Sequence, residues 1–401
     1  MLIKTFGTSN IELAEDVVQE AMLEALNKWT YNGIPDNPIG WIYKVAKYKA
    51  VNILNREKHK RQYASEIAHH LQSEWTVDPI LKHIFTDKEI ADDQLRMIFT
   101  CCHPSLSTDS QVALTLKTLC GFSIPEIATA FLTTEENINK RLVRARKTIK
   151  EADVPFEVPA GKELEPRLSS VLETIYLLFN EGYNATSGAD LIRYELCEEA
   201  IRLAEIITSN PNVKSSNTYA LLALMTLNTS RFNSRIDEFE NLLDLEHQNR
   251  NKWDKDLVKK GLYYLEFSTE QKEISIYHIL ATISAHHCTA LTYESTDWES
   301  ILSLYDLLIQ IDESPIILLN RAIVLSKTSS PKQALKQLAT IEKNPAFRSY
   351  LPYYTTKAEL HFQNKESKTA IGLLNEALKL PLDKNRKTLI NNTLQKYSKP
   401  F

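Results

Sequence analysis

The stretch LTLKTLCGFSIPEIATAFLTTEENINKRLVRARKTI, residues 114–149, carries the clearest structural signals in the chain. Gly121 suits the left-handed position just after a helix, because it has no Cβ to clash there. Ser123 and Glu126 match a capping box, in which two residues three apart satisfy free amide groups of a first helical turn. The pattern therefore predicts that one helix ends near Gly121 and that a short helix spans residues 124–131.

A second capping box, Thr133 with Glu136, predicts a longer helix that runs to about Ile149. Two helices a few residues apart, the second of them basic, are typical of a helix-turn-helix motif. Apolar side chains are expected where the two helices cross, and this set is Ile127, Ala128, Ile138, Leu142 and Ala145.

The second helix of such a motif enters the DNA major groove, where amide, guanidinium and ammonium groups hydrogen-bond to base edges. The outward-facing set is Thr134, Glu135, Asn137, Lys140, Arg141 and Arg144. Arg144, Arg146 and Lys147 are better placed for phosphates, which position a protein without reading sequence. An ordinary helical hairpin with a solvated charged face is the alternative for this motif alone.

The composition around the motif favours an all-α protein. Only 9 glycines and 15 prolines occur in 401 residues, whereas sheets need many tight turns. Leucine and alanine recur with helical spacing over long stretches. No apolar run approaches the roughly 18 residues of a membrane span, and no signal-peptide pattern opens the chain. We therefore expect a cytoplasmic protein with no membrane contact.

The net charge of −4 hides two local basic clusters. Residues 44–61 hold seven lysines and arginines against one acid, Glu57, and residues 140–150 hold six with no acid. Such clusters indicate contact with a polyanion.

Breaks in the pattern predict five segments. A helical unit spans residues 1–62, a linker 63–90, a second helical unit 91–151, a proline-containing linker 152–166, and a helical C-terminal domain 167–401.

The C-terminal domain contains a weak repeat with a period of 36 residues. Ala322, Ala334, Leu335 and Leu338 recur as Ala358, Ala370, Ile371 and Leu374. Small residues twelve apart, followed by large apolar ones, resemble a tetratricopeptide helical hairpin, whose usual period is about 34 residues.

The first unit is predicted to contain two helices. The first, over residues 11–26, is acidic, and Leu13, Val17, Ala21 and Leu26 are expected near one face. A loop then ends this helix. Asn37 is a plausible N-cap, and Pro38 suits the first position of a helix that runs to near Arg61.

Aromatic and basic residues alternate on this second helix. Trp41, Tyr43 and Tyr48 are interleaved with Lys44, Lys47 and Lys49. Aromatic faces stack on unpaired bases while cations hold phosphates, which suits single-stranded DNA. The alternative is that Trp41 and one tyrosine belong to the core.

The order of these segments resembles the extracytoplasmic-function sigma factors. The motifs are AEDVVQEA at residues 14–21, PIGWIYKVAKYKAVNILNREK at residues 38–58 and the later helix-turn-helix. The stretches DDQLRMIFTCCHP (92–104) and YLLFNEGY (176–183) resemble the subgroup with a large tetratricopeptide-like C-terminal domain. Members of the family usually have a fuller first helix than the ten residues before the acidic helix here.

The resemblance implies a role in transcription initiation with two partners, core RNA polymerase and promoter DNA. The acidic helix would bind polymerase through Asp16, Gln19 and Glu20. The second helix would recognise and help open the −10 element through Trp41, Tyr43, Lys44, Lys47, Tyr48, Asn52 and Arg56. The helix from Thr134 would read the −35 element. The C-terminal domain would take the place of a separate anti-sigma protein, or bind another protein partner.

Neither catalysis nor a cofactor is expected. The pairs Cys101-Cys102 and His286-His287 do not match common zinc spacings, and no second ligand pair lies near either. The five cysteines contain no CxxC spacing and suit reduced thiols. Two alternatives stay open: a tetratricopeptide-like scaffold that never touches DNA, and a dimeric helix-turn-helix regulator that acts without polymerase.

Overall fold

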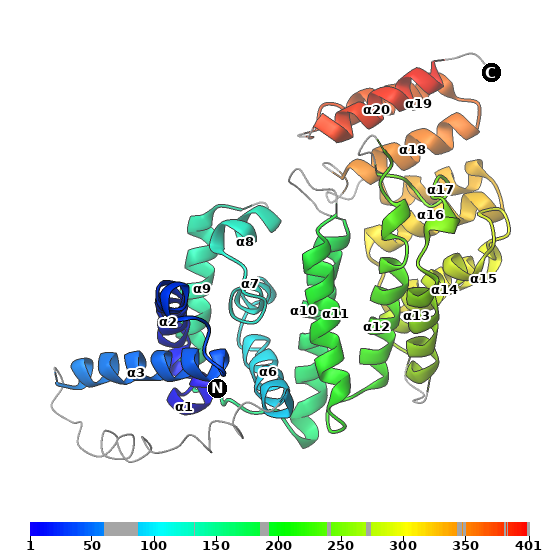
Figure 1. Cartoon of the computed structure of the whole chain (residues 1–401). Coiled ribbons are helices and arrows are strands. Elements are labelled where there is room, and N and C mark those ends of the chain that lie inside the picture. The colour runs from blue at the N-terminus through cyan, green and yellow to red at the C-terminus, as the bar shows by residue number, and fades with distance from the viewer. Residues whose placement is uncertain are drawn as a thin grey trace. The chain divides into compact units, whose positions relative to one another are not determined.

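The structure is a computed structural model, and it describes residues 1–59, 87–131, 133–184, 192–238, 242–269, 274–342, 347, 350–380, 382 and 384–398 (Figure 1). In these residues every regular element is a helix, apart from an isolated bridge between Ile236 and Leu242. The predicted all-α class is confirmed. No helix within the described ranges is long and apolar enough to cross a membrane. Most of the expected linker 63–90, with Lys60 and Arg61 before it, lies outside the described residues.

The chain divides into two compact units, Met1–Leu178 and Phe179–Phe401. The division falls inside one continuous helix, α10 (Leu164–Tyr183), and not within the expected linker 152–166. Residues 167–178, the first twelve of the predicted C-terminal domain, therefore group with the N-terminal unit.

The first unit consists of helices of very different lengths. Before α10 they are α1 (Leu2–Phe6), η1 (Thr8–Asn10), α2 (Ile11–Asn32), α3 (Pro38–His59), α6 (Asp87–Cys101), α7 (Thr108–Thr118), α8 (Ile124–Ala130), α9 (Glu135–Glu151) and η2 (Gly161–Glu163). Helix α6 begins four residues before the expected start of the second helical unit.

Helices α2 and α3 form a hairpin, and its turn matches the sequence prediction. Gly33 follows α2 with a φ of 78°, and the Asn37 side chain accepts a hydrogen bond from the Gly40 amide at 2.8 Å. Pro38 is the first helical residue.

The buried face of α2 differs from its prediction at one position. Val17 and Ala21 are buried as expected, but Leu26 is 68 % exposed and Ala25 is buried in its place. A helix returns to the same face after three or four residues, so residue 25 lies one turn after residue 21.

The helix-turn-helix forms as predicted, with one change in capping. Ser123 and Glu126 make the reciprocal capping box at the start of α8. The start of α9 is capped by Thr134, which accepts from the Asn137 amide at 3.2 Å, so the prediction of Thr133 was wrong. Thr133 accepts instead from the Asn137 side chain. The predicted crossing residues are all buried: Ile127, Ala128, Ile138, Leu142 and Ala145.

Helix α10 is hydrogen-bonded to the helices that precede this motif. The buried Gln111 side chain of α7 accepts from the hydroxyls of Ser170 and Thr174, at 3.0 Å each. Arg167 donates to the Phe99 carbonyl of α6 at 2.7 Å. These bonds explain why the start of α10 groups with the first unit.

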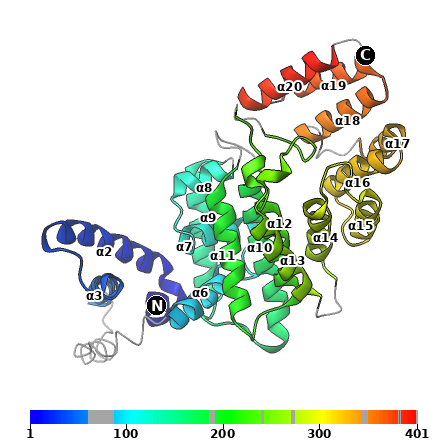
Figure 2. The same ribbon diagram turned by 45° about the vertical axis from the view of Figure 1, so that its right-hand side comes forward.

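The second unit consists of helices joined by short connections. They are α11 (Tyr194–Ser209), α12 (Ser216–Thr229), η3 (Phe232–Ser234), η4 (Arg250–Lys252), α13 (Lys255–Ser268), α14 (Ile276–Thr289), α15 (Trp298–Ile311), α16 (Pro315–Thr328), α17 (Pro331–Ile341), α18 (Leu351–Gln363), α19 (Ser367–Ala377) and α20 (Lys384–Tyr397). Figure 2 shows α18, α19 and α20 side by side.

The 36-residue repeat is visible in the helix boundaries. Helices α18 and α19 each begin 36 residues after α16 and α17, and α19 ends 36 residues after α17. The two alanines and the last leucine of each copy are buried. They are Ala322, Ala334 and Leu338 in the first copy, and Ala358, Ala370 and Leu374 in the second. The two hairpins therefore bury equivalent faces.

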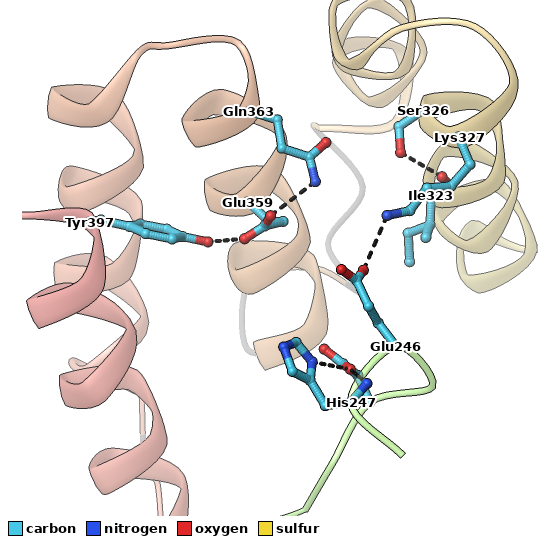
Figure 3. A network of polar contacts seen from close by, with 9 residues as sticks. Glu246, His247, Ile323, Ser326, Lys327, Glu359, Gln363 and Tyr397 are labelled. Carbon is cyan, nitrogen blue, oxygen red and sulfur yellow. Dashed lines mark hydrogen bonds and ion pairs between the residues drawn. The ribbon is translucent and has the colours of Figure 1, made fainter. Parts of the chain in front are cut away.

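Polar contacts tie the last helices together (Figure 3). The Tyr397 hydroxyl of α20 donates to the Glu359 carboxylate of α18, which also accepts from Gln363 at 2.9 Å. The Lys327 ammonium of α16 lies 3.3 Å from the Glu246 carboxylate.

Candidate nucleic-acid interface

The predicted −10 residues all lie on α3, and they differ in exposure. Lys44, Tyr48 and Arg56 are exposed, whereas Trp41, Tyr43, Lys47 and Asn52 are partly buried. Tyr48 is 52 % exposed. An exposed aromatic ring beside cations can stack on a base while the cations hold phosphates.

Trp41 has a structural role in addition to its exposed edge. Its ring meets that of Trp29 from α2 edge-to-face, with centroids 5.5 Å apart, and the Lys28 ammonium lies 5.8 Å from its centroid. The alternative that Trp41 helps to pack the α2–α3 hairpin is therefore correct in part. Tyr43 similarly contacts α1, since its hydroxyl lies 3.4 Å from that of Thr5.

The acidic face of α2 is exposed at Asp16, Gln19 and Glu20. One of these residues is paired with the basic helix, because the Glu20 carboxylate lies 3.1 Å from the Lys49 ammonium. Hydrogen bonding to Glu20, and then to Glu24, raises the pKa of Lys49. Lys49 is thus part of the α2–α3 contact, in contrast to the exposed Lys44.

The predicted −35 residues lie on the first three turns of α9 or at its cap. Thr134, Glu135, Asn137, Lys140 and Arg144 are exposed. Arg141 is partly buried and forms an ion pair with Asp109 of α7 at 3.2 Å. Sequence reasoning missed Asp109, because nothing local relates two residues so far apart in the chain.

A hollow of about 330 Å³ adjoins this face between the start of α7 and the middle of α9. Arg141 and Arg144 line it together with the hydroxyl-bearing residues Ser107, Ser110 and Thr148. Guanidinium and hydroxyl donors of this kind suit a negatively charged oxygen.

Arg146 is not free for phosphates in this arrangement, contrary to the sequence prediction. Its guanidinium donates to the Glu15 carboxylate of α2, and Glu12 lies 3.7 Å away. Glu15 also accepts from the Thr118 hydroxyl of α7 at 2.5 Å. The hairpin of α2 and α3 is therefore bonded directly to the helix-turn-helix body.

The buried cysteines next to His103 are poor candidates for metal ligands. Burial raises the pKa of the Cys101 and Cys102 thiols, that of Cys102 to about 11, and metals bind the thiolate form. His103 Nδ1 lies 2.7 Å from the Ser105 hydroxyl. No cluster of three potential metal ligands occurs among the described residues.

Comparison with known families assigns both DNA-binding segments. The family model of Sigma-70 region 2 matches residues 2–60, and that of Sigma-70 region 4 matches residues 96–149. A family of unknown function (DUF6596) matches residues 167–269. No solved structure matches the chain.

A relative covers most of the chain. An uncharacterized protein of Rhizobium meliloti (strain 1021), R00370, is 33 % identical over 330 residues, which are 81 % of this chain and 76 % of that protein. Regions 2 and 4 follow one another in the expected order. They include α3 and the helix-turn-helix, which expose aromatic and basic side chains. The chain therefore belongs to the sigma-70 type of sigma factors.

Proposed function

We propose that this sigma factor is a member of the extracytoplasmic-function group that directs core RNA polymerase to one class of promoters. The observation that carries the proposal is that one chain has two exposed surfaces suited to DNA. The first contains Tyr48 and Lys44 on α3, and the second contains Asn137 and Lys140 on α9. Its role is regulatory and not catalytic.

Region 2 is proposed to bind the opened −10 strand. Tyr48 would stack on an unpaired base while Lys44 and Arg56 hold the backbone, because these three side chains are exposed along α3. Trp41, Tyr43, Lys47 and Asn52 would complete the surface from partly buried positions.

Region 4 is proposed to read the duplex −35 element. Asn137 and Lys140 would contact base edges from the start of α9, and Arg144 would contact a phosphate near the hollow beside α7. Arg141 would join this contact while paired with Asp109. Thr134 and Glu135 would border the groove.

The acidic face of α2 is proposed to bind polymerase through Asp16, Gln19 and Glu20. Their exposure and like charge suit a basic surface on the partner.

The C-terminal domain is proposed to be tetratricopeptide-like and to regulate polymerase or promoter engagement. The 36-residue recurrence of α16 and α17 as α18 and α19 supports the first part. Its place directly behind region 4 supports the second.

An electrophoretic mobility assay with and without core polymerase tests the proposal against its alternatives. The expected result is a polymerase-dependent complex on promoter DNA that weakens steeply between about 50 and 200 mM salt. A specific complex without polymerase would favour an ordinary helix-turn-helix regulator. The absence of any DNA complex in either condition would favour a protein-binding scaffold.

A further inference from the structure

Three arginines that follow α12 in the chain lie close together in the unit Phe179–Phe401. Arg231 and Arg235 flank η3 and are 6 % and 5 % exposed, and the partly buried Arg250 begins η4. The charge of Arg231 lowers the pKa of both Arg235 and Arg250, after the larger effect of burial. The three guanidiniums therefore share one poorly solvated neighbourhood.

The hydrogen-bond partners of these guanidiniums are neutral. Arg231 donates to the Tyr183 hydroxyl at 2.8 Å and to the Asn228 side chain. Arg235 stacks on the Tyr183 ring, 3.6 Å from its centroid, and donates to the Tyr183 carbonyl.

Arg250 is held in the same way. It donates to the carbonyls of His287 and Ala290 at 2.6 and 2.8 Å and lies over the Trp253 ring. Among the described residues, no carboxylate forms an ion pair with Arg231, Arg235 or Arg250, although the charge of Glu294 raises the pKa of Arg250 against the larger effect of burial. Buried charges are normally paired, because burial of an ion without a counter-charge is strongly unfavourable.

Donors remain unused at this place. Arg231 Nε and Arg250 Nη2 are buried from solvent and have no hydrogen-bond partner in the part of the chain that the structure describes. His287, which is 8 % exposed, has an unpartnered Nδ1, and its ring packs against Trp298. Burial, and then the charges of Arg231 and Arg250, lower the pKa of His287 to about 3, so the ring is neutral near pH 7.

We propose that Arg231, Arg250 and His287 form a binding site for an oxyanion. A phosphate or carboxylate group would accept from Arg231 Nε and Arg250 Nη2, and neutral His287 would donate from Nδ1 in that tautomer. A buried water could fill one donor, but only an anion also balances two guanidiniums.

The site also contacts the helix that continues into the other unit. Tyr183, held by Arg231 and Arg235, is the last residue of α10. An oxyanion that binds Arg231 would therefore change the hydrogen bond from Arg231 to Tyr183 at the end of α10.

Titration calorimetry on the full chain tests the site with sodium phosphate, sodium sulfate and sodium succinate, each against sodium chloride at equal ionic strength. The expected result is saturable binding of at least one oxyanion together with a rise in melting temperature. Phosphate and succinate distinguish a phosphoryl ligand from a carboxylate. Arg250→Gln should weaken the affinity about ten- to a hundredfold, the size of one charge-assisted hydrogen bond.

Lys252→Gln is the matched control, since it removes the same charge from an exposed position of the same turn and should leave the affinity unchanged. If Arg250→Gln does not fold, Arg250→Lys keeps the charge but lacks the second donor, and it should also weaken binding. No saturable binding beyond chloride would overturn the proposal and point to water alone as the partner of these donors. Equal affinity of the Arg250 and Lys252 variants would overturn it too, because the anion would then bind elsewhere.

Discussion

Arg146 of the recognition helix α9 donates to the carboxylate of Glu15 on α2, which joins the region 4 body to region 2. A second bond, from the Thr8 hydroxyl to the Val154 carbonyl at 2.6 Å, lies at the same contact. Helices α2 and α9 have 22 and 17 residues, so at about 1.5 Å per residue neither exceeds roughly 33 Å. Promoter elements about 25 base pairs apart are separated by roughly 85 Å at about 3.4 Å per pair.

The first prediction is that regions 2 and 4 separate when both bind a promoter. Dyes at the exposed positions Tyr31 and Glu151 should show high energy transfer in the free protein and low transfer in the promoter complex with polymerase. Glu15→Gln should lower the transfer of the free protein, because it weakens the contact with Arg146. Energy transfer that stays high in the promoter complex would show that the contact between Glu15 and Arg146 persists.

The second prediction concerns the stacking surface of region 2. Tyr48→Ala should weaken binding of a single-stranded −10 oligonucleotide by about 1–3 kcal/mol, with little change in folding stability, because the ring is exposed. Fluorescence anisotropy with the polymerase complex measures this. Tyr31→Ala is the control, since Tyr31 is 88 % exposed at the end of α2. Equal losses for the two variants would count against a specific stacking site.

The third prediction separates base reading from phosphate contact in region 4. Asn137→Ala should weaken the binding free energy by about 1–3 kcal/mol on the cognate −35 sequence and by much less on a scrambled one. Arg144→Ala should weaken binding to both sequences alike. It should also reduce the salt dependence of the binding constant by the contribution of about one phosphate contact. Lys379→Ala, on the exposed surface of the other unit, serves as the control. The same sequence dependence in both α9 variants would refute this division of roles.

The fourth prediction concerns α10. A chain that ends at Leu178 should melt at a higher temperature than one that ends at residue 166, because only the longer chain keeps the bonds of Arg167 and of Gln111. Loss of the partners of buried Gln111 costs about 1–3 kcal/mol. Gln111→Ala in the full chain should lower the melting temperature as well. Identical melting of the two shortened chains would show that α10 contributes nothing to the region 4 body.

Local signals in the sequence were sufficient for the helix ends. Asn37 with Pro38, and Ser123 with Glu126, specify their caps through residues at most three apart. The choice between Thr133 and Thr134 was not local, because both lie three residues before a helical amide.

The contacts between distant segments could not be read from the sequence. Arg146 and Glu15 are 131 residues apart, and each looks like an ordinary charged residue on a helix surface. The boundary inside α10 was hidden for a similar reason, since the prolines of residues 152–166 give a stronger local signal than one glutamine side chain does. Arg231, Arg235 and Arg250, which form no ion pair among the described residues, could not be grouped from the sequence before the fold brought them together.

Run-off transcription of genomic DNA by core RNA polymerase, with and without this protein, tests the central claim most directly. The account predicts new transcripts whose start sites share a −10 and a −35 sequence, and it predicts their loss with Asn137→Ala and Tyr48→Ala. Transcripts identical with and without the protein, from a preparation that binds core polymerase, would contradict the account.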